Sequence, residues 1–303
     1  MNETRIGLIG VGLMGHGIAT SILRHKHELT ILEHAGNQPV EDLLAAGATT
    51  IDTASALARK VDVVILCVTG TPQVEDILFR QGGLLEGLQP GGIVIDCSTA
   101  IPSSTVKIAQ AVEKAGGLFL DAPMTRTPKE AAEGKLNLIV GGDRALYDRC
   151  LPLLQCYAEN IVYAGKTGSG HQLKLLHNFV SLGFSTVLAE AAACARLAGV
   201  DAETFTDILS NGGGGGVVLN RLRPYIETGD VSGFRFTISN ALKDMGYYTA
   251  MAEDVGAPLA AAAAIQQVYA DASNAGLAQS PVPELIGYLA NTESVPAESS
   301  GKP

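Results

Sequence analysis

A helix-like segment in this sequence places a lysine beside other polar side chains that could take part in chemistry. In the run GHQLKLLHNFVS, Lys174, His177, Asn178 and Ser181 follow i, i+3, i+4 and i+7 spacing, so on a helix they share one face. A lysine in a partly desolvated cleft has a lowered pKa and can exchange a proton with an alcohol or carbonyl oxygen. A solvated polar helix face has the same spacing, so these residues alone leave both interpretations open.

A glycine-rich stretch near the start of the chain predicts a dinucleotide site. GLIGVGLMGHGIA contains Gly10, Gly12 and Gly15 in G-x-G-x-x-G spacing, between a strand-like run and a helix-like run. Such glycines allow a sharp turn and let a pyrophosphate approach the helix N-terminus. Leu13 and Met14 open that helix and are expected to belong to the same cofactor site.

The carboxylate that would select the nicotinamide cofactor is Glu33. It ends the second strand-like run, about twenty residues after the glycines, where a carboxylate can accept hydrogen bonds from a ribose diol. A 2′-phosphate would be repelled there, and no arginine follows to offset the repulsion. We therefore expect NAD(H) to be preferred and NADP(H) to be the less favoured cofactor.

Three further clusters place polar side chains where ligands bind. IDCSTAIPSS puts Ser98 and Thr99 just past a strand, at the carboxyl end where open α/β sheets bind ligands. NALKDMG places Lys243 on a later helix. DAPMTRTPKEAAEGKLN holds Arg126 between two threonines; a guanidinium offers planar paired donors for carboxylate, sulfonate or phosphate oxygens. The simpler alternatives are a capping serine, a surface ion pair, and pairing of Arg126 with Glu130 or Glu133.

The elements that must position these residues change character near Tyr163. Before it, apolar strand-like runs alternate with amphipathic helix-like runs, which predicts a doubly wound, mostly parallel sheet covered on both faces. After it, one helix of about thirty residues and several shorter ones are expected, with no further strand. We predict a dinucleotide-binding domain over residues 1–163, an all-α domain over 164–292 and a flexible tail over 293–303.

Composition excludes several other classes. The formal charge of −10 on 303 residues argues against nucleic acid and against an anionic membrane surface, and no run reaches transmembrane length. The five cysteines and six histidines show neither disulfide nor metal-ligand spacing, so we expect no metal and a reducing, cytoplasmic location. An anionic substrate would need local positive groups in this acidic chain.

Taken together, the motifs resemble the β-hydroxyacid dehydrogenase family, which includes 3-hydroxyisobutyrate dehydrogenases, tartronate semialdehyde reductases and sulfolactaldehyde reductases. The resemblance runs from about Arg5 to Asp271, and its motifs occur in family order. They are the glycine turn, Asp96-Cys97-Ser98-Thr99, Asp121-Ala122-Pro123, Gly168-x-Gly170-x-x-x-Lys174-x-x-x-Asn178, and Lys243-Asp244. It implies a Rossmann domain, a long interdomain helix, an all-α C-terminal domain and a homodimer or homotetramer.

The resemblance also implies roles for individual residues. Lys174 corresponds to the family's catalytic lysine, and Asn178 is expected to orient that lysine or the substrate. Ser98 and Thr99 should lie beside the nicotinamide and substrate. Val68 matches a backbone cofactor contact, and Lys243 matches a lysine that closes over the cofactor.

The substrate loop departs from the general family pattern. Most members carry Ser-Gly-Gly where this chain has Thr125, Arg126 and Thr127; an Arg-Thr pair there resembles the sulfolactaldehyde reductases, in which it helps to bind a sulfonate. Ser181 fits that branch, whereas His177 replaces an expected asparagine but could still donate to an anion. The glycine run at 212–216 lies where the family has a small-residue loop, so either a substrate contact or a plain connector is expected.

We therefore expect an NAD-dependent oxidoreductase that interconverts a short 3-hydroxy acid, or a sulfonate analogue, with its semialdehyde. Lys174 would be the general acid or base and Arg126 would bind the anionic head group. The alternatives are a non-catalytic NAD-sensing Rossmann protein and an imine reductase, whose members generally lack the lysine. The sequence leaves the exact substrate, the direction of reaction and the oligomeric state open.

Overall fold

The computed structural model describes residues 4–291, which form two compact units. The first unit ends at Leu176 and the second begins at His177, so the division falls inside one continuous helix, α9 (Ser169–Leu197). Each unit has its own core and is described separately. The tail predicted over residues 293–303 lies outside the described residues.

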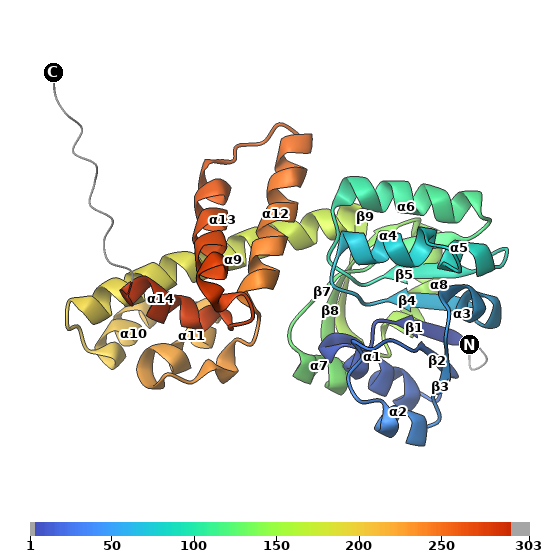
Figure 1. Ribbon diagram of the computed structural model, residues 1–303, viewed down its shortest axis with the longest axis horizontal. Helices are drawn as coiled ribbons and strands as arrows, with labels where there is room; N and C mark the ends of the chain where they lie inside the picture. The colour runs from blue at the N-terminus through green and yellow to red at the C-terminus, as the bar shows by residue number, and fades with distance from the viewer. Residues whose placement is uncertain (1–3, 292–303) are drawn as a thin grey trace. The chain divides into compact units, whose positions relative to one another are not determined.

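One sheet forms the centre of the first unit (Figure 1). Its strands are β1 (Ile6–Ile9), β2 (Leu29–Leu32), β3 (Thr49–Ile51), β4 (Val63–Leu66), β5 (Ile93–Asp96), β6 (Leu118–Asp121), β7 (Met124–Thr125), β8 (Leu136–Gly142) and β9 (Ala158–Gly165). The order β3-β2-β1-β4-β5-β6 is parallel throughout, and the chain reverses direction of winding between β1 and β4. This is the doubly wound order that binds dinucleotides at the reversal point. β8 extends the sheet by pairing antiparallel with β6 and β7 and parallel with β9.

The helices of the first unit cover both faces of the sheet (Figure 1). They are α1 (Leu13–Arg24), α2 (Glu41–Ala45), α3 (Ala54–Lys60), α4 (Thr71–Phe79), α5 (Leu84–Gly87), α6 (Pro102–Lys114), α7 (Pro128–Glu133) and α8 (Arg144–Leu154). Apolar side chains of α1 and α8 join one core cluster, and those of α3, α4, α5 and α6 join the other. The predicted two-faced, mostly parallel sheet is confirmed.

Three strands are too short or too polar to appear as apolar strand-like runs in the sequence: β3, β7 and β9. β3 and β7 are three and two residues long, too short for a period to be recognised. β9 begins AEN, with Glu159 and Asn160 exposed, so its polar start hides the strand. Backbone pairing with β8 stabilises it in spite of this composition.

The start of α9 is fixed to the sheet by a buried carboxylate at the end of β6. Asp121 accepts hydrogen bonds from the backbone N–H groups of Gly168 and His171, at 2.7 and 3.0 Å. A Cβ added to Gly170 would collide with the carbonyl oxygen of Ile139, so this close approach requires glycine. The first turns of the helix therefore belong to the first unit, which ends at Leu176.

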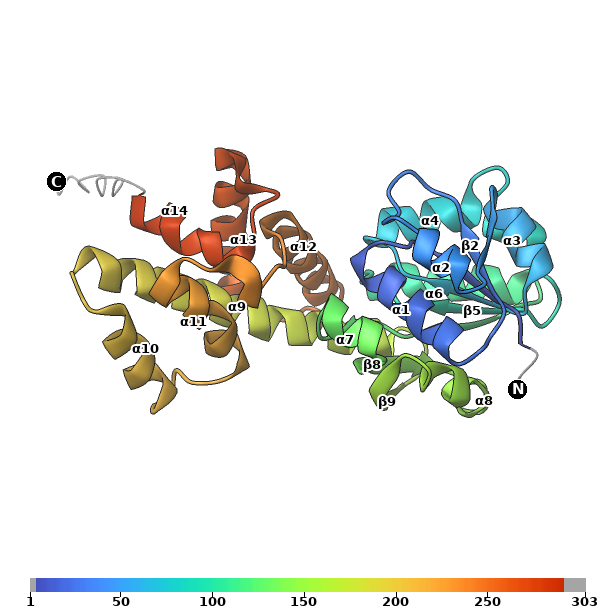
Figure 2. The same ribbon diagram turned by 90° about the horizontal axis from the view of Figure 1, so that it is seen from below.

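Within its described residues, the second unit contains helices and a single β-bridge but no strand (Figure 2). Besides most of α9, it comprises α10 (Ala202–Ser210), α11 (Val217–Thr228), η1 (Val231–Gly233), α12 (Ile238–Asp254), α13 (Ala260–Ala272), η2 (Ser273–Leu277), η3 (Val282–Glu284) and α14 (Leu285–Asn291). Phe179 of α9 stacks on Tyr248 of α12 with ring centroids 4.1 Å apart. The hydroxyl of Tyr269 on α13 donates to the carbonyl oxygen of Leu182, at 3.0 Å. These contacts make α9 the common packing partner of α12 and α13.

The expectation that no run reaches transmembrane length requires a correction. Among the described residues, α9 is long and apolar enough to cross a membrane by length and composition alone, with a mean hydropathy of 1.3. Half of that stretch is buried against other parts of the protein. A core helix of a soluble protein passes the same test, because both need an apolar surface over many turns.

Candidate active site

In the glycine turn between β1 and α1, the fold has no room for a Cβ at two of the three glycines but has room at the third. Gly10 has φ 93°, and a Cβ there would collide with the carbonyl oxygen of Cys67. A Cβ on Gly15 would collide with the carbonyl oxygen of Gly10. A Cβ on Gly12 would meet no atom within 4 Å. The open space over Gly12 is thus where a ligand backbone or phosphate could approach closely.

The N-terminus of α1 is free to take an anion. Gly12 caps it without a side-chain hydrogen bond, and no acidic residue lies in its first turn. Leu13 is exposed and Met14 is half-buried, so the predicted pair lies at the accessible helix end. Unpaired N–H groups and the helix dipole together favour a pyrophosphate here.

Glu33 and Asn37 follow the end of β2, beside the glycine turn. Glu33 follows β2 directly and is exposed, and its carboxylate has no hydrogen-bond or ion-pair partner among the described residues. Asn37 was not predicted: its side chain accepts from the N–H of Val11 at 3.1 Å and donates to the carbonyl oxygen of Leu32 at 3.0 Å. Asn37 therefore holds the glycine turn against the end of β2, next to the carboxylate.

The structure brings the predicted residues Val68 and Ser98 together. The N–H of Val68 donates to Ser98 Oγ at 3.1 Å, and the N–H of Ser98 donates to Asp96 Oδ1 at 2.9 Å. Asp96 is fully buried, and burial raises the pKa of its carboxyl group. Thr99 follows in a half-buried position at the same strand end. Two neighbouring strand ends, β4 and β5, are thus locked together at the ligand edge of the sheet.

The sequence analysis did not single out His171, which is fully buried behind this edge. Its Nε2 lies 3.1 Å from the carbonyl oxygen of Ser98, and its Nδ1 lies 2.8 Å from Thr105 Oγ1. It stands three residues before Lys174 on α9, and Lys174 itself is half-buried. A histidine three residues before a candidate lysine was the only signal available in the sequence.

The three residues of the predicted substrate loop each have a partner within the first unit. Thr125 Oγ1 accepts from Asn137 at 3.0 Å, and the N–H of Thr127 donates to Glu130 at 3.0 Å in the capping box of α7. The hydrogen bond from the Thr127 hydroxyl lowers the pKa of Glu130.

Arg126 lies between them with φ 82°, a left-handed conformation that favours glycine. Its Nη1 forms an ion pair with Glu159 Oε2 at 2.6 Å and also donates to the carbonyl oxygen of Lys135. The partner is thus Glu159 of β9, not the Glu130 or Glu133 considered from the sequence. The side chains of Arg126 and Glu159 are 30% and 53% exposed, so the ion pair lies at the surface.

In the second unit, α9 and α12 share a polar network. Asn178 is buried and donates to Asp244 Oδ2 at 2.6 Å, so its own amide oxygen accepts from His177 Nδ1 at 3.0 Å. Lys243 Nζ forms an ion pair with Asp244 Oδ1 at 2.9 Å. Asp244 therefore links the predicted residues Asn178 and Lys243. Ser181 is half-buried one turn further along α9.

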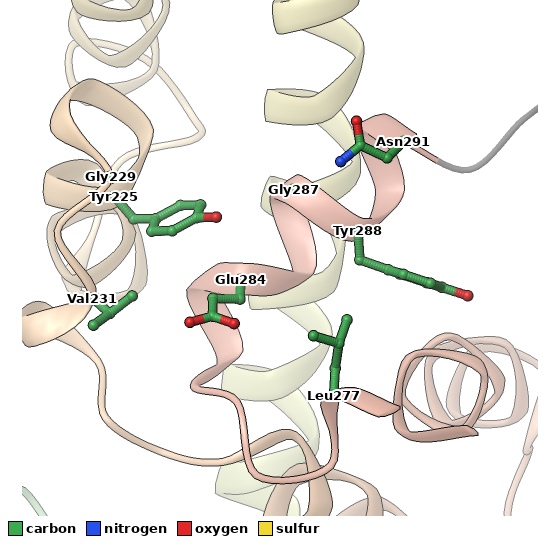
Figure 3. Close-up of a pocket in the computed structure, with 8 residues that line it drawn as sticks. All are labelled: Tyr225, Gly229, Val231, Leu277, Glu284, Gly287, Tyr288 and Asn291. Carbon is green, nitrogen blue, oxygen red and sulfur yellow. The ribbon is translucent and has the colours of Figure 1, made fainter. Parts of the chain in front are cut away.

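Two cavities that lie within the units are lined by none of the predicted site residues. One of about 440 Å³ lies between α11 and α14 (Figure 3). Burial, followed by repulsion from Glu284, raises the pKa of the Tyr225 hydroxyl there. The other, of about 850 Å³, opens at the amino ends of the strands around Arg5 and Arg149. The glycine run at 212–216 connects α10 to α11 and lines neither cavity. Among residues 4–291, no group of three or more His, Cys, Asp or Glu side chains could hold a metal ion.

These features define a class of protein. A doubly wound sheet with an open glycine turn at its reversal point, joined to a helical unit by a lysine-bearing helix, is a dinucleotide-binding oxidoreductase architecture. Residues 5–165 match the family model of the NAD binding domain of 6-phosphogluconate dehydrogenase. Residues 168–289 match the model described as NAD-binding of NADP-dependent 3-hydroxyisobutyrate dehydrogenase. The chain belongs to the β-hydroxyacid dehydrogenase family.

Individual relatives agree with this assignment. The uncharacterized oxidoreductase YkwC of Bacillus subtilis is 32% identical, over 83% of this chain and 86% of that protein. The crystal structure of 3-hydroxyisobutyrate dehydrogenase (ygbJ) from Salmonella typhimurium is 27% identical with a TM-score of 0.83, covering 94% of this chain and all of that one. An imine reductase from Myxococcus stipitatus in complex with NADP+ shares the fold, with a TM-score of 0.63, 18% identity, and coverage of 94% and 99%. The expected family and a nicotinamide cofactor are thus confirmed.

Proposed function

We propose that this protein is an NAD(H)-dependent oxidoreductase that interconverts a short 3-hydroxy acid, or a sulfonate analogue, with its semialdehyde. The observation that carries the proposal is the anchoring of the Lys174 helix, through Asp121 and His171, to the strand ends that follow the glycine turn. The test is a screen of NADH oxidation with methylmalonate, tartronate and succinate semialdehydes and sulfolactaldehyde. If the protein turned over none of these four compounds, the proposed substrate class would be refuted.

Lys174 is proposed as the general acid and base. The nicotinamide, when bound, supplies or accepts the hydride at the hydroxyl-bearing carbon. In the direction of reduction, Lys174 Nζ donates the proton that the forming hydroxyl oxygen requires; in oxidation it accepts that proton. Asn178, one turn along α9, is proposed to orient the substrate oxygen, with Asp244 holding its amide in place.

Arg126 is proposed to bind the anionic head group of the substrate. The conformation of its backbone supports this role, because a non-glycine residue at φ 82° costs about 1 kcal/mol that a glycine would avoid. The general family pattern has glycine at this place, so the arginine is retained at a cost in stability. Its ion pair with Glu159 lies at the surface, and exposed pairs contribute only about 0–1 kcal/mol. A substrate carboxylate or sulfonate can therefore replace Glu159 as the partner.

Ser98, Thr99 and Val68 are proposed to form the wall beside the nicotinamide, and Thr125, Thr127, His177 and Ser181 to complete the substrate site. Glu33 is proposed to select NAD(H) over NADP(H), since its exposed carboxylate has no partner among the described residues and would repel a 2′-phosphate. Lys243 is proposed to contact the bound cofactor, with Asp244 as its counter-charge.

An exposed apolar face on α9 supports the proposal of a homodimer or homotetramer. Leu173, Leu176, Val180 and Val187 lie on this helix at spacings of three, four and seven, and each is between 43% and 69% exposed. Apolar residues at heptad spacing are typical of helices that pack against a partner helix. Light scattering should give at least twice the mass of one chain, and Val180→Lys together with Val187→Glu should lower it to 31.4 kDa. A monomeric wild-type protein would refute the proposal.

An imine reductase is the second candidate, favoured by the shared fold of such enzymes. Lys174 argues against it, because imine reductases generally lack this lysine. A non-catalytic NAD sensor is the third. Lys174→Ala separates these candidates: it should abolish semialdehyde turnover while NADH still binds. Turnover of an imine that Lys174→Ala leaves unchanged would favour imine chemistry, and a wild-type protein that binds NADH without any turnover would favour the sensor. A cytoplasmic location is proposed from the cysteine pattern alone.

A further inference from the structure

Two buried carboxylates stand side by side behind the ligand edge of the sheet. Asp96 of β5 and Asp121 of β6 are paired in register, and neither is exposed to solvent. Asp96 accepts the N–H of Ser98, and Asp121 accepts the N–H groups of Gly168 and His171. One carboxylate therefore holds the strand-end loop at Ser98, and its neighbour holds the first turn of α9.

The His171 ring connects these two elements. Its Nε2 lies 3.1 Å from the carbonyl oxygen of Ser98. A carbonyl oxygen can only accept, so Nε2 must carry a hydrogen and donate it. Asp96 Oδ2 is 4.0 Å from the same nitrogen, too far to compete for that hydrogen. Nδ1 contacts Thr105 Oγ1 at 2.8 Å, which fixes the ring plane from the other side.

The link has consequences for the residues proposed to do chemistry. Lys174 lies three residues after His171, so both side chains lie on one face of α9 on successive turns. On the other side of the link, the Ser98 hydroxyl accepts the N–H of Val68. The ring therefore sets the distance between the start of the lysine helix and the paired strand ends that would face the nicotinamide.

We propose that His171 is a positioning residue for the reaction, whose Nε2–H bond to the Ser98 carbonyl fixes the Lys174 turn of α9 against the strand-end loop at Val68 and Ser98. This inference rests on the proposed function, since it assigns the link a role in that turnover. A buried, fully bonded ring is suited to this task because a change in any partner would leave polar groups unpaired in a dry interior.

Two conservative substitutions separate positioning from mere stability. The amide nitrogen of glutamine reaches the place of histidine Nε2, whereas the shorter asparagine side chain reaches only the place of Nδ1. His171→Gln should keep the bond to Ser98 and hold kcat within about threefold of wild type. His171→Asn should lower kcat by about tenfold to a hundredfold, since a misplacement of about 1 Å can cost a hundredfold. The dissociation constant of NADH should be unchanged in both variants.

A control addresses the other side of the ring. Thr105→Val removes the Nδ1 partner and leaves the Nε2 bond in place. It should lower the melting temperature while kcat stays near wild type. Equal kcat in His171→Gln and His171→Asn at equal melting temperature would overturn the proposal. If His171→Asn weakened NADH binding but left kcat unchanged, that result would also overturn the proposal.

A second measurement does not depend on turnover. In a ¹H–¹⁵N spectrum of the whole protein, the His171 ring should show a slowly exchanging hydrogen on Nε2, with a nuclear Overhauser effect to Ser98. Its absence would overturn the proposed link even if the enzyme is active. If the link is present but no semialdehyde turns over, the proposed function fails instead, so the two failures are distinguishable.

Discussion

Replacing Arg126 with glycine separates substrate binding from folding at a single position. The substitution removes the guanidinium and also relieves the left-handed backbone at φ 82°. The relief is worth about 1 kcal/mol, and the lost surface pair with Glu159 costs about 0–1 kcal/mol. The free energy of unfolding should therefore stay equal or rise slightly, which urea denaturation measures.

The effect of this substitution on catalysis should be large and confined to KM for the substrate. Hydrogen bonds to a charged group contribute about 1.5–3 kcal/mol, and each 1.4 kcal/mol is about tenfold, so KM for the anionic substrate should rise about 10- to 150-fold. The NADH dissociation constant should not change, because Arg126 lies outside the glycine turn and the Glu33 strand end. Steady-state kinetics with the best semialdehyde from the screen measure KM, and fluorescence titration measures the NADH dissociation constant.

The matched control is Glu159→Gln, which removes the competitor and leaves the arginine. Breaking an exposed pair worth about 0–1 kcal/mol frees the guanidinium, so KM should fall, by up to about fivefold. If the Arg126–Glu159 pair is only a surface contact, both variants should leave KM unchanged. That result would refute the proposed role of Arg126 whatever the stability data show.

The remaining predictions concern the cofactor edge and the dependence on pH. Gly12→Ala should leave the melting temperature nearly unchanged, since its Cβ meets open space, yet weaken NADH binding about tenfold or more by filling that space; Gly15→Ala should instead destabilise the fold through its clash with Gly10. Unaltered NADH affinity in Gly12→Ala would argue against a pyrophosphate there. Glu33→Ala should reduce the preference for NADH over NADPH, measured as the ratio of kcat/KM; a constant ratio would remove Glu33 from the ribose site. Burial, followed by repulsion from His25, lowers the pKa of His27 below the value of about 6.5 in the unfolded chain. Between these two pKa values the unfolded state binds more protons, so the free energy of unfolding should fall as the pH decreases below about 6.5, and His27→Gln should flatten that decline in urea titrations. An identical pH profile in the variant would show that other groups cause it.

The sequence predicts the parts of this molecule that short-range physics dictates. Alternation of apolar strands with amphipathic helices indicates the parallel sheet, because each pattern reflects which faces of an element are buried. The glycine spacing marks the turn in part for a local reason: Gly15 is required by the carbonyl oxygen of Gly10, whereas Gly10 is required by Cys67 at the end of a distant strand. Family motifs add the order of the site residues along the chain.

Short or polar elements escape such analysis. β9 pairs with β8 along most of its length although it begins with a glutamate and an asparagine. Its stability comes from a ladder with a distant strand, which its own composition does not reveal. The long helix α9 was predicted, but its division between two compact units depends on the anchoring of its first turns by Asp121.

Residue patterns predict the class of fold, the glycine turn and the candidate residues Lys174, Asn178 and Arg126. The side chains that these residues contact depend on how the chain folds. Arg126 pairs with Glu159, 33 residues away, and Asn178 pairs with Asp244, 66 residues away. His171, which the sequence marked only by its place three residues before Lys174, reaches Ser98 across 73 residues. Hydrogen bonds act over about 3 Å in space, and only the folded path of the chain brings such distant positions that close.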